Sequence, residues 1–203
     1  TFSNLENELF STKLIALFLF SQQIFFDFNG YTLMAIGVGK TIGINLPENF
    51  NAPYLASSIS DFWKRWHITL SSWIKDYIYI PFGGSRNGLF KNYLNILIAM
   101  IISGIWHGAG YNFLIWGFAH GLFIVIEKLF NKFKILNINI YIKILINYFI
   151  VTFLWLFFRI ENLDDLRLFF QNFSFIDLID INLVFFLFLI LILNYVQKFL
   201  TIN

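Results

Sequence analysis

The chain has 203 residues, of which 58% are hydrophobic and 13% are charged, and its formal net charge is +2. Soluble domains are about 45–50% apolar and about 25% charged, so we expect a lipid bilayer to be part of the solvent of this chain. The near-neutral charge argues against a nucleic-acid partner. The sequence contains no cysteine, which excludes disulfides, thiolate nucleophiles and cysteine-based metal sites.

The first apolar segment, Leu9 to Phe28, is long enough for a membrane helix of about 20 residues. Lys13 and the pair Gln22-Gln23 interrupt it. Polar interruptions of this kind favour a helix that faces protein rather than lipid.

Asp27 to Tyr31 is predicted to end this segment in an interfacial turn, with an intramembrane carboxylate at Asp27 as the alternative. A weaker segment with three glycines follows from Thr32 to Ile44. Two prolines and three asparagines then predict a loop from Asn45 to Pro53.

The core region, Asp61 to Gly121, holds all three histidines and five of the six tryptophans. It opens with a predicted helix from Asp61 to Tyr79, in which most large apolar side chains share one arc and the charged ones lie opposite. We expect this helix to lie along the membrane interface, with His67 at the edge of the apolar arc and turned inward. Pro81 ends it, and a polar, glycine-rich turn follows.

From Asn92 to Ile126 the chain carries no charged residue. A straight helix over this run would be about 52 Å long, whereas the hydrocarbon core is about 30 Å thick. We therefore predict a break at Gly108-Ala109-Gly110, which places His107 deep in the membrane beside irregular backbone. Such backbone is tolerated there only against protein or a water-filled cavity. The flanking charges leave a hairpin and a broken single pass both open.

The last third is predicted to contain a polar segment with four lysines (residues 127–143), a membrane helix from Ile144 to Phe158, an interfacial segment (161–172) and a final span from Ile181 to Leu200. The whole pattern predicts an all-α polytopic membrane protein, with residues 1–203 in a single membrane-embedded domain. Because the chain starts at Thr1, we expect it to be a piece of a longer protein.

A neutral histidine at membrane depth is a candidate general base for a hydroxyl group. The chain has no Gly-x-Ser-x-Gly elbow and no His-Glu-x-x-His zinc motif, so neither an acyl-enzyme nor a metal site is indicated. Haem ligation by His107 and His120 would require partner histidines that this chain lacks. The residues alone therefore leave acyl transfer and a proton relay open, and we expect His120 to be structural.

An ordered set of short motifs between Phe26 and Gly121 resembles the membrane-bound O-acyltransferase (MBOAT) superfamily, in its bacterial alginate and peptidoglycan O-acetylation branch. The motifs are Phe26-Asp27-Phe28-Asn29-Gly30-Tyr31, Pro47-Glu48-Asn49-Phe50, Asp61-Phe62-Trp63-Lys64-Arg65-Trp66-His67, Asp76-Tyr77-Ile78-Tyr79-Ile80-Pro81-Phe82-Gly83-Gly84, Gly104-Ile105-Trp106-His107-Gly108, Trp116-Gly117 and His120-Gly121.

The resemblance implies the C-terminal part of a funnel of tilted, interfacial and broken helices, with the N-terminal half of the family fold missing. His107 matches the invariant histidine at the funnel floor, and His67 matches a second histidine on the donor side, so both are candidate catalytic residues. Four further residues in the matched motifs are candidate supporting residues: Trp106, Arg65, Asp76 and Asp61.

The implied reaction passes an acyl group, acetyl in the simplest case, from a cytoplasmic thioester such as acetyl-CoA across the bacterial inner membrane. No cofactor or metal is implied as a bound group. A periplasmic, esterase-like partner acetyltransferase would then acetylate an exopolysaccharide or peptidoglycan acceptor. We expect this piece alone to be inactive. The alternative is a non-enzymatic channel or exporter with structural or relay histidines.

Overall fold

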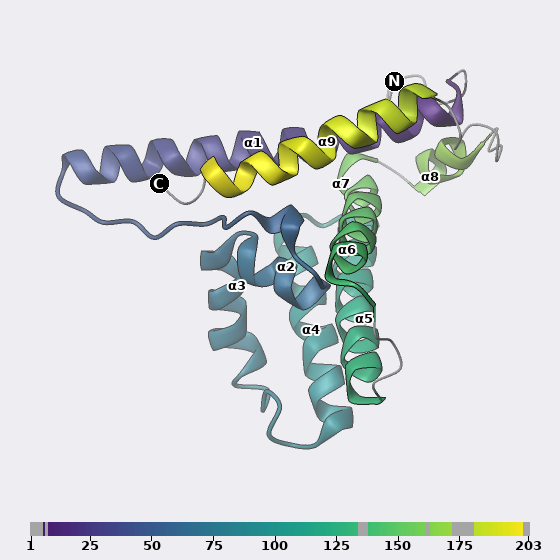
Figure 1. The fold of residues 1–203 in the computed structure, drawn as a ribbon. Coiled ribbons are helices and arrows are strands. Elements are labelled where there is room, and N and C mark those ends of the chain that lie inside the picture. The colour runs from purple at the N-terminus through teal and green to yellow at the C-terminus, as the bar shows by residue number, and fades with distance from the viewer. Residues whose placement is uncertain (1–5, 7, 134–137, 161–162, 172–180, 201–203) are drawn as a thin grey trace.

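The computed structural model describes residues 6, 8–133, 138–160, 163–171 and 181–200, and the regular elements in this part of the chain are helical. In chain order they are α1 (Phe10–Thr41), a 3-10 turn (Pro53–Leu55), α2 (Ile59–Arg65), α3 (Ile68–Ile74), a π-helical turn (Lys75–Tyr79), α4 (Leu89–His107), α5 (Tyr111–Phe133), α6 (Ile140–Leu154), α7 (Leu156–Arg159), α8 (Leu163–Phe170) and α9 (Ile181–Leu200). The predicted all-α class is confirmed. Figure 1 shows the long helices α1 and α9 side by side, lying across one end of α4, α5 and α6.

Helices α4 and α5 pack against each other as a hairpin whose connection is residues 108–110. Glycines allow the two backbones to approach closely. A Cβ atom on Gly104 would collide with the carbonyl group of Phe113, and one on Gly117 would collide with that of Met100. The predicted break is therefore confirmed, and the hairpin is the arrangement found.

Three helices in the described residues are long and apolar enough to cross a membrane: α4, α5 and the pair α6–α7 over Ile140–Arg159. The last of these confirms the membrane helix predicted near residues 144–158. The predicted final span forms a helix, α9, with the predicted bounds.

The polar segment at 127–143 begins inside α5, and its residues 134–137 lie outside the described part. Of the predicted interfacial segment, 161–162 and 172 also lie outside it, and α8 covers most of the rest.

Helix α1 is continuous over 32 residues. The predicted turn at Asp27 to Tyr31 is therefore wrong, and the weaker segment after it extends the same helix to Thr41. A glycine in a helix interior costs about 1 kcal/mol relative to alanine, which is less than packing along a long helix can supply. Asp27 is exposed, so its carboxylate needs no buried partner.

Polar side chains of α1 join it to other helices. Gln22 donates to the hydroxyl of Tyr148 on α6 at 3.1 Å and to Asn194 Oδ1 on α9 at 3.0 Å. Lys13 is fully buried, and its Nζ donates to the backbone carbonyl of Leu168 at 2.7 Å. The prediction that these polar residues face protein is confirmed for Lys13 and Gln22 and is wrong for Gln23, which is exposed.

The predicted single helix from Asp61 to Tyr79 is wrong, because the chain leaves the helical conformation at Trp66 and His67. Trp66 is extended (φ −104°, ψ 127°), and His67 is left-handed (φ 43°, ψ 57°), a conformation that is uncommon for a residue with a side chain. A single β-bridge between Phe50 and Trp66 holds the break against the preceding loop. This long-range contact has no counterpart in the local apolar periodicity.

The break turns Trp66 into an aromatic core that joins the loop to α5 and the α6–α7 junction. The members of this core are each at most 4% exposed: Phe25, Phe50, Tyr54, Phe62, Trp66, Trp116 and Trp155. The Trp66 ring lies 5.0 Å from the ring of Phe50 and 5.0 Å from that of Trp155. Trp73 and Tyr77, two other large aromatic side chains of the predicted helix, are 50% and 67% exposed.

Candidate functional site

His67 and His107 line one cavity of about 290 Å³, although α3 and α4 separate them in the chain. The remaining lining residues are aromatic or aliphatic: Ile24, Phe28, Trp66, Trp106, Trp155 and Phe158. They belong to α1, to the break after α2, to the end of α4 and to the α6–α7 junction. The cavity therefore depends on contacts between helices that are distant in sequence.

His107 is the last residue of α4 and lies beside the irregular residues 108–110, as predicted. Its ring packs edge to face against Trp116 at 5.2 Å and against Phe158 at 4.9 Å between ring centroids. None of the hydrogen bonds found among the described residues involves its ring nitrogens. Both nitrogens are therefore available to a substrate.

His67 enters the same cavity from the helix break. Its ring meets the ring of Phe28 edge to face at 4.7 Å, and its Nδ1 lies 3.3 Å from Oδ1 of Asn49. Burial lowers the pKa of His67 below its usual value of 6.5, because a charged imidazolium is poorly solvated there. At neutral pH this histidine is therefore uncharged.

The predicted supporting residues divide between the cavity and the surface. Trp106 lines the cavity with 60% of its surface exposed. Arg65 Nε donates to Asp61 Oδ1 at 2.9 Å, and the second oxygen of Asp61 accepts from the backbone N–H of Ser57, so this pair stabilises the start of α2. Asp76 is exposed on the π-helical turn. Arg65, Asp61 and Asp76 do not line the cavity.

His120 lies outside the cavity, within the aromatic core. It is fully buried, its Nδ1 accepts from the indole N–H of Trp63 at 3.3 Å, and its ring stacks over Phe62. Because Nδ1 is an acceptor, the proton of the neutral ring is on Nε2. These contacts fit the structural role predicted for His120.

Sequence reasoning gave no role to Asn49 or Thr69, which contact His67. Oδ1 of Asn49 accepts from both the backbone N–H and the hydroxyl of Thr69. In the sequence, Asn49 stood out only as part of the motif Pro47-Glu48-Asn49-Phe50, which does not indicate what its side chain contacts. Its place beside His67 depends on the bridge between the loop and the break.

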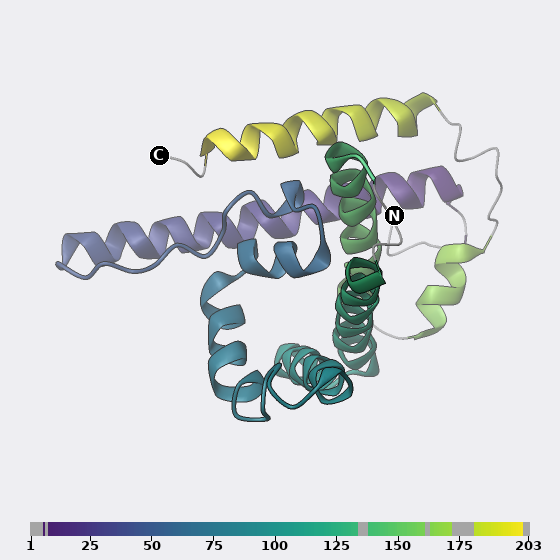
Figure 2. The same ribbon diagram turned by 60° about the horizontal axis from the view of Figure 1, so that its bottom comes forward.

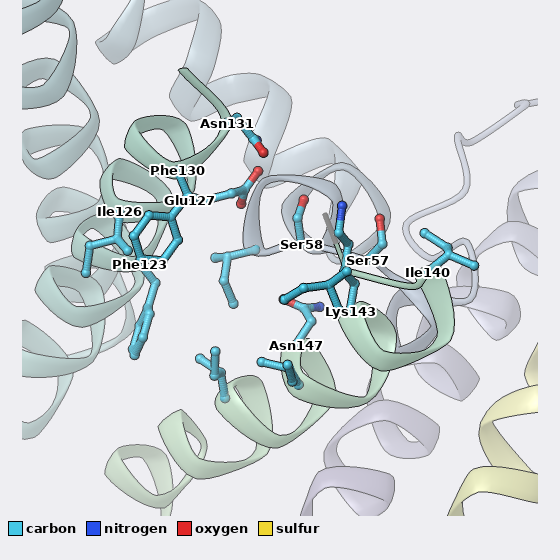
Figure 3. Close-up of a pocket in the computed structure, with 14 residues that line it drawn as sticks. Ser57, Ser58, Phe123, Ile126, Glu127, Phe130, Asn131, Ile140, Lys143 and Asn147 are labelled. Atoms are coloured by element: carbon cyan, nitrogen blue, oxygen red, sulfur yellow. The ribbon is translucent and has the colours of Figure 1, made fainter. Parts of the chain in front are cut away.

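A larger pocket, of about 410 Å³, lies between α5 and α6 and contains neither His67 nor His107 (Figure 3). Figure 3 shows Glu127 and Asn131 on the α5 side and Lys143 and Asn147 on the α6 side, around an apolar interior. Pocket size therefore does not identify the candidate site. The histidine pair does, because a neutral imidazole can accept a proton from a hydroxyl group.

The residues of the described ranges include no group of three or more histidine, aspartate or glutamate side chains able to hold a metal ion. The chemistry available in the cavity is thus that of two imidazoles in aromatic surroundings.

Figure 2 shows α4 and α5 together, with α2 and α3 on one side of the hairpin.

The fold and the cavity together define a helical membrane protein in which two helix breaks bring two histidines to one aromatic cavity. A family model described as MBOAT, membrane-bound O-acyltransferase family, matches residues 6–163, and the chain belongs to this family.

Bacterial relatives carry names from three acyl-transfer reactions. A probable alginate O-acetylase of Pseudomonas aeruginosa is 40% identical over 159 residues, which are 78% of this chain and 31% of that protein. A peptidoglycan O-acetyltransferase of Helicobacter pylori is 44% identical over 149 residues, 71% of this chain and 28% of that protein. A teichoic acid D-alanyltransferase of Bacillus subtilis is 33% identical over 129 residues, which are 60% of this chain and 33% of that protein. The matched region is thus about a third of each relative's length.

Proposed function

We propose that the protein is a membrane-bound O-acyltransferase that passes an acyl group, acetyl in the simplest case, from a cytoplasmic thioester donor such as acetyl-CoA across the membrane. The observation that carries this proposal is the cavity shared by His67 and His107 in a chain of this family. The acceptor polymer is an exopolysaccharide or peptidoglycan. The names of the Pseudomonas and Helicobacter relatives support this polymer class.

In the proposed reaction a hydroxyl group enters the cavity and gives its proton to the neutral imidazole of His107. The hydroxyl oxygen then forms a bond to the carbonyl carbon of the thioester, and the carbon–sulfur bond breaks. The imidazolium returns the proton to the leaving thiolate. The products are an O-acyl ester and a free thiol, and no acyl group is carried on this chain.

Aromatic walls suit this chemistry because they limit water, which would otherwise hydrolyse the thioester. Phe158 and Trp116 pack against the His107 ring and restrict its orientation. A base held in one orientation loses less entropy when the reactants meet.

The cellular setting follows from the reaction. We place the protein in the bacterial inner membrane as a multi-pass protein, with the thioester on the cytoplasmic side and the acceptor on the other. A periplasmic, esterase-like acetyltransferase is the proposed partner that delivers the acyl group to the polymer. The three apolar helices support the membrane part of this proposal.

The test is the substitution of His107 in the complete protein. His107→Gln and His107→Ala should abolish transfer of labelled acetyl groups to polymer while the protein stays in the membrane. Ile105→Ala, at a residue 52% exposed on the same helix, is the matched control and should retain activity. Retained acetylation in the His107 variants at normal expression would contradict the proposal.

A binding experiment separates the enzyme from a channel or exporter. The complete protein should bind a labelled acetyl thioester, and His67→Gln or His107→Gln should weaken that binding or prevent turnover. A polysaccharide exporter has no reason to bind a thioester. Absence of binding in the unmodified protein would favour the exporter.

A further inference from the structure

Three contacts converge on the side-chain oxygen of Asn49. The backbone N–H of Thr69 donates to it at 3.1 Å, the hydroxyl of Thr69 donates to it at 2.6 Å, and Nδ1 of His67 lies 3.3 Å away. A backbone N–H has no acceptor function, so the Asn49 atom that it meets must be the oxygen and not the amide nitrogen. The donor from Thr69 thereby settles the orientation of an amide that is otherwise ambiguous.

This orientation decides the protonation of the His67 ring. The Asn49 oxygen can only accept, so the contact with Nδ1 is a hydrogen bond only when Nδ1 carries the proton. The Thr69 hydroxyl is 3.4 Å from the same Nδ1, but its hydrogen is already directed to Asn49. A neutral ring with a proton on Nδ1 has its lone pair on Nε2.

We propose that Asn49, oriented by Thr69, is the positioning residue of His67 and fixes the tautomer in which Nε2 is a second proton acceptor of the acyl-transfer cavity, beside the general base His107. The loop and the break are also held together by the bond from the backbone N–H of Ile68 to the carbonyl of Asn49, at 3.0 Å. Asn49 therefore determines both the position of the His67 ring and the ring nitrogen that carries its proton. The expected effect on rate rests on the proposed function, but the tautomer does not.

Among the residues that the structure describes, few charged or titratable groups lie near His67. His107 faces it across the cavity. Glu48 precedes Asn49 but is exposed, and Arg65 is paired with Asp61. Burial favours the neutral ring, in agreement with an acceptor role for Nε2.

The experiment compares three variants of the complete protein in membranes. Asn49→Ala removes the acceptor and should lower kcat by about 10²-fold, the scale of a lost proton acceptor, with little change in KM. Asn49→Asp keeps the acceptor and should restore activity relative to Asn49→Ala. Asn51→Ala is the matched control, since Asn51 lies on the same loop, its side chain is exposed, and its hydrogen bonds with Arg65 use only its backbone.

The pH dependence of Asn49→Asp gives a readout that a purely structural role would not change. A carboxylate beside Nδ1 stabilises the imidazolium and raises the pKa of His67. The acid limb of the rate profile should therefore move to higher pH. An active Asn49→Asp variant with an unmoved acid limb would overturn the proposal, as would an Asn49→Ala variant as active as the Asn51→Ala control.

The tautomer can be read without any activity. In protein labelled with ¹⁵N-histidine, the ring signals of His67, assigned by their loss in His67→Gln, should show Nδ1 protonated and Nε2 unprotonated. A protonated Nε2 in the unmodified protein would refute the role of Asn49 even if acyl transfer is confirmed. The expected tautomer in a protein without transferase activity would instead refute the proposed function alone.

Discussion

The glycine contact between α4 and α5 gives a stability prediction with an internal control. Alanine is favoured over glycine in a helix interior by about 1 kcal/mol, so Gly→Ala at an open helical position should stabilise the protein. At Gly117 the added Cβ would lie 3.1 Å from the carbonyl carbon of Met100 and 3.2 Å from Cα of Gly104. These are backbone atoms, so relief requires the hairpin itself to open.

Overpacking of this kind costs about 1–3 kcal/mol, which exceeds the gain in helix propensity. We expect Gly117→Ala to lower the free energy of unfolding by up to about 2 kcal/mol. Gly37→Ala in α1 is the matched control: a Cβ there meets nothing within 4 Å, so the same substitution should raise the free energy of unfolding by up to about 1 kcal/mol. The two changes should have opposite signs.

The assay is the temperature at which the complete, detergent-solubilised protein loses its monodisperse form, measured for both variants beside the unmodified protein. Acyl transfer by Gly117→Ala should also fall, because the hairpin carries His107 at its turn. The reasoning would be refuted if Gly117→Ala were as stable as the unmodified protein. It would also be refuted if Gly37→Ala were destabilised to the same extent.

Three further outcomes are expected. Asn112 donates from Nδ2 to two backbone carbonyls at the end of α7, at 3.0 and 3.2 Å. Asn112→Ala should therefore lower the free energy of unfolding by about 2–3 kcal/mol, which should appear as a lower transition temperature in the same thermal assay. Asp61→Asn breaks a partly exposed ion pair with Arg65, so it should lower the free energy of unfolding by less than about 1 kcal/mol and leave acetyl transfer near normal. A severe loss of transfer would contradict the position of Asp61 outside the cavity. The lowered pKa of His67 keeps it neutral at pH 7, so the transfer rate should fall only below pH 6.5, and an acid limb above that value would count against a neutral His67.

The break at residues 108–110 was predictable because it follows from the length of the apolar run that contains it. An apolar run that exceeds the bilayer thickness must bend, and glycine is where bending costs least. The break at His67 was not predictable in this way, because the apolar periodicity continues through it without a glycine or a proline. Its cause is the bridge to Phe50, a residue in a preceding loop.

The candidate site shows the same division. Both histidines were singled out from the sequence, from their residue type, their surroundings and the matched motifs. The grouping of both around one cavity, the position of Asn49, and the separation of Arg65, Asp61 and Asp76 from the cavity all required the structure. Contacts between separate segments have no local signature in one sequence.

The sequence by itself predicted a lipid environment for this protein, the apolar runs that form α4, α5, α6 and α9, the break beside His107 and the family motifs. These follow from composition, run length and residue order, which are local quantities. Only the tertiary structure decided that α1 runs on through Gly30, that the helix after Asp61 breaks, and that two histidines share a cavity. Local conformational preferences differ by about 1 kcal/mol per residue, whereas burying one large aromatic ring contributes about 1.5–3 kcal/mol, so packing overrules local preference where rings such as Trp66 and Trp155 meet.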